Sequence, residues 1–248
     1  MSFQKTISIY LRRARRKVCD AYFAGGKVCD AFTNERTAFA VLFLLCIAMQ
    51  AFFSYNDRIK TILEDTTMKV SVIQMNMRSL ESKANFDRAG ACIAEYDKTH
   101  PFTPMGEHEV YTPGDHLVTF TLDSVRCGLL ICYEVRFPEL WRTLALRGAQ
   151  VMFLPAQWTA ARQYHWETLT AARAIENQLF VVSCNACGER DGTLYGGFSR
   201  ILDPLGAVLA QGGGEEEIVT ADLDLSSIAP LRKAVPVFHD RRPELYRL

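Results

Sequence analysis

Apolar segments alternate with helix-like segments through the second half of this chain. An apolar run over residues 125–132 has the length and composition of a buried strand. After it we predict a helix at 138–147, a strand at 151–155, a helix at 164–177 and a strand at 179–185. Two helices placed between strands, with hairpin-like turns later in the chain, predict mixed α/β layers.

Further strands are predicted on both sides of this region. Val70, Val72 and Ile73 fit a buried strand, and Met68 is a candidate start of an independent domain. The remaining predicted elements are a helix at 82–89 and strands at 91–96, 117–122, 197–202, 208–211 and 217–222.

The apolar run ends at Cys132, and a helix-like segment that contains Pro138 begins just after it. A strand that meets a helix in a sharp turn places its last side chain at the carboxyl edge of a sheet. There the first free N–H groups of the helix lower the pKa of a thiol and can hold an oxyanion. A lone buried cysteine is more often a small hydrophobic residue, but this setting makes Cys132 a candidate nucleophile.

Composition limits the classes of function. Lys plus Arg and Asp plus Glu number 28 each, so no global charge favours a nucleic-acid partner. Eight cysteines at irregular spacing favour reduced thiols of an intracellular protein over a disulfide framework. Cys184 and Cys187 have C-x-x-C spacing, but no second pair completes a zinc site, and the pair lies at a strand end that meets a Gly-rich turn.

The N-terminal part of the chain divides into three segments. Residues 1–36 are basic, residues 37–55 carry no charge, and residues 56–67 form a polar linker. As a helix, 37–55 would be about 28 Å long, close to the thickness of the hydrocarbon core of a bilayer. We therefore predict a candidate membrane anchor with a cytosolic N-terminus, because basic residues precede it. The alternatives are a buried helix, or upstream sequence joined to a soluble cytoplasmic enzyme.

Three motifs within residues 68–248 resemble the carbon–nitrogen hydrolase (nitrilase) superfamily. They are Leu-Leu-Ile-Cys-Tyr-Glu-Val-Arg-Phe-Pro-Glu-Leu around Cys132, Tyr-Asp-Lys-Thr-His-Pro-Phe around Lys98, and Arg-Ala-Ile-Glu-Asn-Gln from Arg173. The C-terminal stretch 221–243 most resembles the omega-amidase branch. The resemblance implies an αββα sandwich, hydrolysis of a small amide by a Glu–Lys–Cys triad, and no metal or organic cofactor.

The resemblance also implies roles for individual residues. Cys132 would attack the amide carbonyl and form a thioester, while Lys98 would hold the developing oxyanion. Glu107 would position the reacting groups, or it is a plain acid of the loop after the lysine. The candidates for contact with the substrate are Tyr133, Arg136, which could face a carboxylate, and Trp158, which forms a pocket wall or simply packs.

The first catalytic residue of the family, a glutamate at a strand end after Leu-Pro, has no counterpart in this sequence. Only 28 residues separate Val70 from Lys98 (98 − 70), about one βαβ unit, where the family pattern needs at least one more unit. The domain is therefore interpreted as shortened near residues 89–91. Loss of a general base, typically worth about 10²–10⁴-fold, predicts an impaired or inactive member, and lost strands predict an exposed sheet edge.

Other interpretations remain open at this point. The chain could be a catalytically inactive, membrane-tethered interaction protein, or an N-acyltransferase of the same superfamily, although those enzymes carry several membrane spans. Relatives pair through the helices that flank the cysteine turn, so a homo-oligomer is predicted. Arg173 and Glu176, three residues apart on one helix, are predicted to form a structural ion pair.

Overall fold

A six-stranded sheet forms the centre of the computed structural model, which describes residues 3–4, 6–11, 67–74, 91–122 and 124–246. The strand order is β13-β12-β9-β8-β7-β6. In chain order these strands are β6 (Thr119–Leu122), β7 (Val125–Leu129), β8 (Val151–Ala156), β9 (Phe180–Asn185), β12 (Arg200–Leu202) and β13 (Val208–Gln211).

The strands β7, β8 and β9 are parallel neighbours at the middle of this sheet. Parallel neighbours need crossover connections, which α4 (Pro138–Leu146) and α5 (Gln163–Asn177) supply. All six residues of β8 are buried, as expected of a central strand that is covered on both faces.

Both helices begin and end where their sequences favour it. Pro138 occupies the first turn of α4, where its missing N–H leaves no hydrogen bond unmade. In α5 the buried residues recur every three or four positions, which places them on the face toward the sheet. The helix ends at Asn177, and the C-cap residue Gln178 has a φ of 47°, in the left-handed region.

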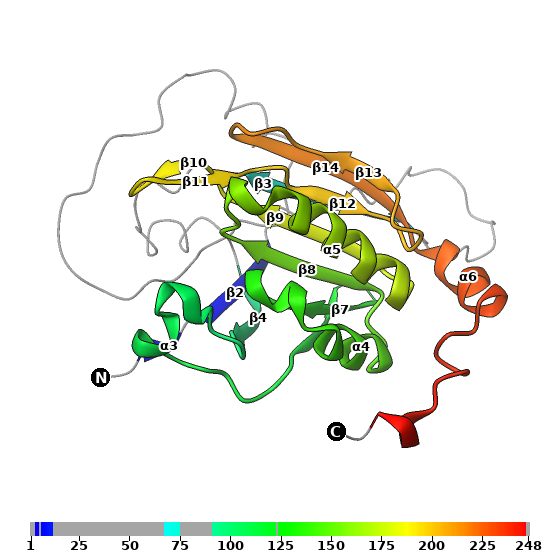
Figure 1. Ribbon diagram of the computed structural model, residues 1–248. Coiled ribbons are helices and arrows are strands. Elements are labelled where there is room, and N and C mark those ends of the chain that lie inside the picture. Colours follow the sequence, from blue (N-terminus) through cyan, green and yellow to red (C-terminus); the bar gives the residue numbers. More distant parts are fainter. Residues whose placement is uncertain (1–2, 5, 12–66, 75–90, 123, 247–248) are drawn as a thin grey trace.

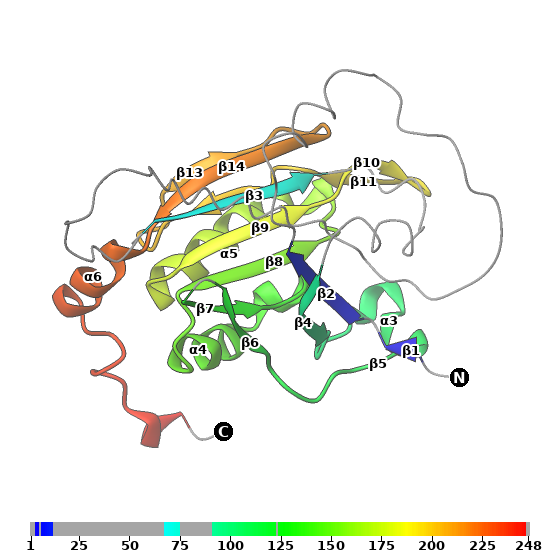
Figure 2. The ribbon, with the colours of Figure 1, turned by 180° about the vertical axis from the view of Figure 1, so that it is seen from behind.

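Two strand ladders lie on the opposite face of the central sheet from α4 and α5 (Figures 1 and 2). One pairs β3 (Thr67–Gln74) with β14 (Glu217–Asp224), and the other pairs β2 (Thr6–Leu11) with β4 (Ala91–Asp97), both antiparallel. Met68, Val70 and Val72 alternate along β3 and are buried, so one face of this strand packs into the core.

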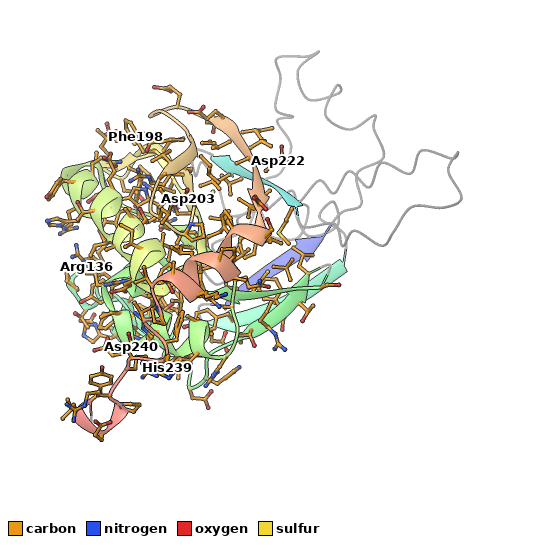
Figure 3. All side chains as sticks on the ribbon, turned by 90° about the vertical axis from the view of Figure 1, so that its right-hand side faces the viewer. Arg136, Phe198, Asp203, Asp222, His239 and Asp240 are labelled. Carbon is orange, nitrogen blue, oxygen red and sulfur yellow. The ribbon has the colours of Figure 1, made fainter. Side chains whose placement is uncertain are left out.

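The smaller elements lie around this body. They are β1 (Phe3–Gln4), η1 (Thr103–Met105), α3 (Glu107–Val110), β5 (Tyr111–Thr112), η2 (Cys132–Arg136), η3 (Ala160–Arg162), β10 (Cys187–Arg190), β11 (Thr193–Gly196), η4 (Leu225–Ser227), α6 (Ile228–Ala234) and η5 (Pro243–Leu245). The strand β1 pairs with β5 in parallel, and β10 pairs with β11 as a hairpin. After α6 the chain extends away from the body, and His239 and Asp240 lie in this extension (Figure 3).

The predicted mixed α/β fold is confirmed, with corrections at three element ends. The strand β7 ends at Leu129, because residues 132–136 turn into η2 before α4. The strand β12 starts at Arg200 rather than at residue 197, because Gly197 and Phe198 have positive φ angles of 67° and 51°. The C-x-x-C pair does not meet a Gly-rich turn, because β10 begins at Cys187.

Other predictions concern residues outside the described ranges. The αββα sandwich needs a second helical layer, and the helix predicted at 82–89 lies outside the described residues, as does the apolar segment 37–55. Among the helices that the structure describes, none is both long and apolar enough to cross a membrane. One side of β4 is paired with β2, and the exposed sheet edge expected from the shortened segment stays a prediction.

Candidate active site

Cys132 lies at a sharp turn between β7 and α4. The chain continues extended from Leu129 as far as Ile131, and Cys132 then adopts a φ of 48° at the start of η2. A positive φ is uncommon for a residue other than glycine and marks a strained position. The thiol is half-buried, and its Sγ lies 3.8 Å from the carbonyl oxygen of Gln157, to which it donates a weak hydrogen bond.

The buried side chain of Glu134 stabilises this turn through hydrogen bonds to the backbone. Its side chain is completely buried, and its Oε2 accepts a hydrogen bond of 2.7 Å from the N–H of Ile131. Its Oε1 accepts bonds from the Tyr96 hydroxyl at 2.8 Å and from the Thr99 N–H and hydroxyl at 2.8 and 2.6 Å. The His100 N–H adds a longer bond of 3.2 Å. A buried carboxylate is stable only with such partners, so Glu134 ties the cysteine turn to residues 96–100.

Lys98 lies in the segment that Glu134 holds. The lysine follows the end of β4, is 3% exposed, and its Nζ donates a hydrogen bond of 2.6 Å to Glu107 Oε2. The same Glu107 oxygen accepts a bond of 2.8 Å from the Phe102 N–H. The backbone of Gly114 packs directly on this segment, because a Cβ there would lie 2.3 Å from the carbonyl oxygen of Asp97.

Aromatic contacts join the lysine segment to the cysteine turn. The ring centroids of Phe102 and Tyr133 are 4.9 Å apart, and those of His100 and Phe137 are 4.1 Å apart. Burial, together with the charge of Glu134, raises the pKa of Tyr96, so its hydroxyl stays a hydrogen-bond donor to that carboxylate. The structure therefore brings the two predicted catalytic segments together from positions far apart in the sequence.

A small pocket opens beside Cys132. Its volume is about 330 Å³ including the open mouth, and it is lined by Phe102, Met105, Cys132, Tyr133, Arg136, Gln157, Trp158, Thr159 and Arg162. The Arg136 guanidinium lies 4.9 Å from the centroid of the Trp158 ring, and that of Arg162 lies 5.7 Å from the Phe102 ring. Figure 3 shows Arg136 at the periphery of the molecule, beside the helical layer. Two cations over aromatic walls suit a small ligand with an anionic end.

The predicted site residues fall into two groups around this pocket. Cys132, Tyr133, Arg136 and Trp158 line it, whereas Lys98 and Glu107 lie in the adjoining segment that Phe102 connects to the pocket. The segments of Lys98 and Cys132 are joined through Glu134, whose carboxylate accepts hydrogen bonds from both.

Several contributors were missed from the sequence. Arg162 and Phe102 line the pocket, and Asn185 holds the backbone of Trp158. Phe102 is the last residue of the motif around Lys98, which offered a usable signal, whereas no motif singles out Arg162 or Asn185. The hairpin β10–β11 had a usable signal, because Asp191 and Gly192 form a two-residue turn with φ angles of 50° and 73°.

Other cysteine and charge predictions have clear outcomes. Arg173 and Glu176 form an ion pair of 2.7 Å, and Arg173 Nε also donates to the carbonyl of Val135, as expected for a structural pair. Burial raises the pKa of Cys184 to about 12 and that of Cys187 to about 11, so both thiols stay protonated. Within the described ranges, no three His, Cys, Asp or Glu side chains gather as a metal site.

Comparison with known proteins shows the family of this chain. The carbon–nitrogen hydrolase family matches residues 69–233, most of the chain. The chain belongs to this family. It is 46% identical over 160 residues to the 2-oxoglutaramate amidase of Bacillus subtilis, covering 64% of this chain and 62% of that protein. It is 36% identical over 172 residues to human omega-amidase NIT2, covering 66% of this chain and 62% of that protein.

Solved carbon–nitrogen hydrolases share the fold. The Caenorhabditis elegans NitFhit protein matches with a TM-score of 0.60 and 39% identity, over 64% of this chain and 41% of that chain. A mutant amidase from Nesterenkonia, with the acetamide moiety of fluoroacetamide bound covalently at its active-site cysteine, matches with a TM-score of 0.57 and 30% identity, over 64% and 57%. The chain thus spans about three fifths of the length of the curated relatives described here.

Proposed function

We propose that this protein hydrolyses the carbon–nitrogen bond of a small amide through a thioester on Cys132. The observation that carries the proposal is the half-buried thiol at a strained turn, open to a pocket and tied through Glu134 to the segment of Lys98. The family membership and the amidase names of the relatives support the same reaction class. The Nesterenkonia adduct supports a cysteine as the attacking group.

The reaction follows from the chemistry of these groups. The Cys132 sulfur adds to the amide carbonyl carbon, and the carbonyl oxygen becomes an oxyanion that the Lys98 ammonium stabilises. Such electrostatic donors are typically worth about 3–4 kcal/mol. The carbon–nitrogen bond then breaks, ammonia leaves with the proton of the thiol, and water cleaves the thioester to release the acid. Glu107 holds the ammonium in place through its bond to Lys98 Nζ.

The substrate is proposed to be a short omega-amide with a carboxylate at its other end. Arg136 and Arg162 give the pocket two guanidinium groups, and a carboxylate can bind such groups through paired hydrogen bonds. The aromatic walls formed by Phe102, Tyr133 and Trp158 would hold the short carbon chain. A substrate of this kind agrees with the name of the Bacillus subtilis relative.

The activity of this chain is proposed to be lower than that of a full-length amidase. The sequence has no counterpart of the first family glutamate, and Glu107 is the carboxylate that the described structure places on Lys98. Without a dedicated general base, the rate is expected to fall by about 10²–10⁴-fold. A transcript that encodes an in-frame Leu-Pro-Glu stretch within codons 85–95 would restore the triad and overturn this part of the proposal.

The protein is also proposed to form a homo-oligomer through α4 and α5. Leu146 of α4 and Ile175 of α5 are 46% and 53% exposed, which leaves apolar side chains on the outer side of this helical layer. A second copy of the chain would cover them. Sedimentation of the wild type and of a double variant with Leu146→Glu and Ile175→Glu tests this assembly.

A turnover assay tests the proposed reaction. The full chain is incubated with a small omega-amide acid and with the uncharged amide of equal length, and released ammonia is measured against the variant Cys132→Ala. Slow ammonia release that requires Cys132 and favours the charged substrate is the expected result. Ammonia release no greater than that of Cys132→Ala would overturn the proposed reaction.

A further inference from the structure

Asn185 is completely buried at the end of β9, and its side-chain amide is fully used. Its Nδ2 donates to the carbonyl oxygens of Trp158 at 3.1 Å and Gly197 at 2.9 Å. Its Oδ1 accepts a short bond of 2.6 Å from the N–H of Trp158. Both polar groups of the Trp158 backbone are thus bonded to one amide, as the two donors and one acceptor of an asparagine allow.

The segment that Asn185 holds is the wall of the pocket. The Trp158 ring lines the pocket and carries the Arg136 guanidinium at 4.9 Å, and the preceding carbonyl, that of Gln157, faces Cys132 Sγ at 3.8 Å. Asn185 itself does not line the pocket. A shift of the Trp158 backbone would therefore move the wall, the arginine contact and the neighbour of the thiol together.

The surrounding backbone leaves Asn185 little freedom to move. Its N–H donates to the hydroxyl of Ser199 at 2.9 Å, and the next residue, Ala186, donates to the carbonyl of Ala156 at 3.0 Å. The Gly196 N–H adds a bond of 3.0 Å to the carbonyl of Trp158. Because these bonds join β8, β9 and β11, the amide is anchored to the sheet and not to a flexible loop.

We propose that Asn185 is a positioning residue of the active site, which sets the Gln157–Trp158 wall at the working distance from Cys132 and Arg136. The inference rests on the reaction proposed above. Its physical basis is that a displacement of about 1 Å at a reacting group can cost about 10²-fold in rate. Asn185 acts through the residues it holds and does not touch the substrate.

The chain supplies a matched control for this role. Asn177 is equally buried, but its Nδ2 donates to the carbonyl of Arg173 at 3.0 Å and to Glu176 at 3.3 Å, within α5. Loss of either amide removes buried hydrogen bonds and lowers the free energy of unfolding. Only loss of the Asn185 amide frees the pocket wall.

The first test compares Asn185→Ala with Asn177→Ala at a temperature where both are folded. For Asn185→Ala we expect KM to rise by about tenfold and kcat/KM to fall by about 10–100-fold, because the wall that meets the substrate is displaced. For Asn177→Ala we expect kcat and KM to stay within about twofold of the wild type, since its bonds do not reach the pocket. Wild-type kinetics in folded Asn185→Ala, or equal losses in both variants, would overturn the proposal.

The second test uses Asn185→Asp and serves if the alanine variant does not fold. The protonated carboxyl can accept from the Trp158 N–H and donate to one carbonyl, whereas the ionised carboxylate faces two carbonyl oxygens. The nearby titratable groups are Cys184, Cys187 and Tyr195, whose pKa values are raised mainly by burial, so they stay protonated near neutral pH. The kcat/KM of this variant should therefore fall as pH rises, relative to wild type, and a parallel profile would contradict the role.

The third measurement separates this inference from the proposed function. The rate at which iodoacetamide alkylates Cys132 needs no turnover, and it should change by about threefold or more in Asn185→Ala but not in Asn177→Ala, since only the first variant moves the carbonyl beside the thiol. A wild type that labels but releases no ammonia defeats the proposed reaction alone. An unchanged labelling rate in Asn185→Ala defeats the positioning role alone.

Discussion

Two cysteine-bearing segments leave the same edge of the central sheet, and they differ in almost every chemical respect. Cys132 follows β7 and Cys184 lies near the end of β9, and both strands run parallel to β8. At Cys132 the chain turns through a positive φ, and the thiol is half-buried beside a pocket. At Cys184 the chain stays extended, and the thiol is 1% exposed with a pKa raised to about 12.

The difference teaches that the edge of a parallel sheet does not by itself create a nucleophile. At the cysteine turn, the buried carboxylate of Glu134 binds the backbone N–H of Ile131, and the Cys132 thiol lies beside the pocket. At the end of β9 the buried amide of Asn185 bonds to the backbone of Trp158 in the pocket wall, while the neighbouring thiols of Cys184 and Cys187 are buried.

The largest effect is expected when the Cys132 thiol is removed, and removal of the Cys184 thiol is the matched control. Cys132→Ala should reduce ammonia release by about 10³-fold or more, because the attacking atom is lost. Cys184→Ala should retain turnover within about threefold and lose some stability as a small cavity forms. Steady-state kinetics of both variants test this prediction. Comparable losses of activity would contradict the assignment of different roles to Cys132 and Cys184.

Glu134→Gln should weaken both the fold and the site. One side-chain oxygen becomes an NH₂ group that cannot accept the N–H bonds now made to the carboxylate, so a buried donor is left unmatched. The free energy of unfolding should fall by about 2–3 kcal/mol, measured by urea denaturation. Glu139→Gln, on the outer part of α4, is the control and should change stability by less than about 0.5 kcal/mol.

Selective alkylation tests the same contrast without turnover. In the folded protein at neutral pH, iodoacetamide should label Cys132 about 10²-fold faster than Cys127, Cys184 or Cys187, because those three thiols are buried with raised pKa values. Mass spectrometry of peptides locates the label. Unfolding in urea should abolish the difference, and fast labelling of Cys184 in the native protein would count against the contrast.

The smallest effect is expected in the alkaline stability of the fold. The pKa of Cys184 rises from 9.0 to about 12 on folding, so above pH 9 the unfolded chain loses this proton and the folded one keeps it. The contribution of Cys184 to the free energy of unfolding is complete below pH 9.0 and decreases as pH rises from 9.0 to about 12. At pH 10 the loss is about 1 kcal/mol. Cys184→Ala should flatten this part of the curve of unfolding free energy against pH, and an unchanged slope would refute it.

The sequence predicted the elements whose signals are local. The apolar run before Cys132, the proline that opens α4 and the spacing of Arg173 and Glu176 each depend on residues within a few positions of one another. The strand, the start of the helix and the ion pair were confirmed because their signals are short-range, although the strand ends at Leu129 and not at residue 132. The family resemblance added Lys98 and Glu107, which the structure pairs at 2.6 Å.

The parts that escaped prediction depend on contacts between distant segments. Glu134 reaches residues 96–100, more than thirty positions earlier, and Asn185 reaches Trp158, 27 positions earlier. The residues next to Glu134 and Asn185 in the sequence give no signal that identifies these distant partners. The pairing of β2 with β4 escaped for the same reason, because it joins the N-terminal strand to residues 91–97.

The left-handed backbone at Cys132 restricts what chemistry could be installed at this position. With φ at 48°, a residue branched at Cβ would crowd its own backbone, so threonine is disfavoured while serine, asparagine and glycine fit more easily. Protein engineers who want an alcohol in place of the sulfur therefore have serine as the practical choice. The backbone conformation of Cys132 therefore limits which nucleophilic residues could replace the cysteine, whatever the substrate.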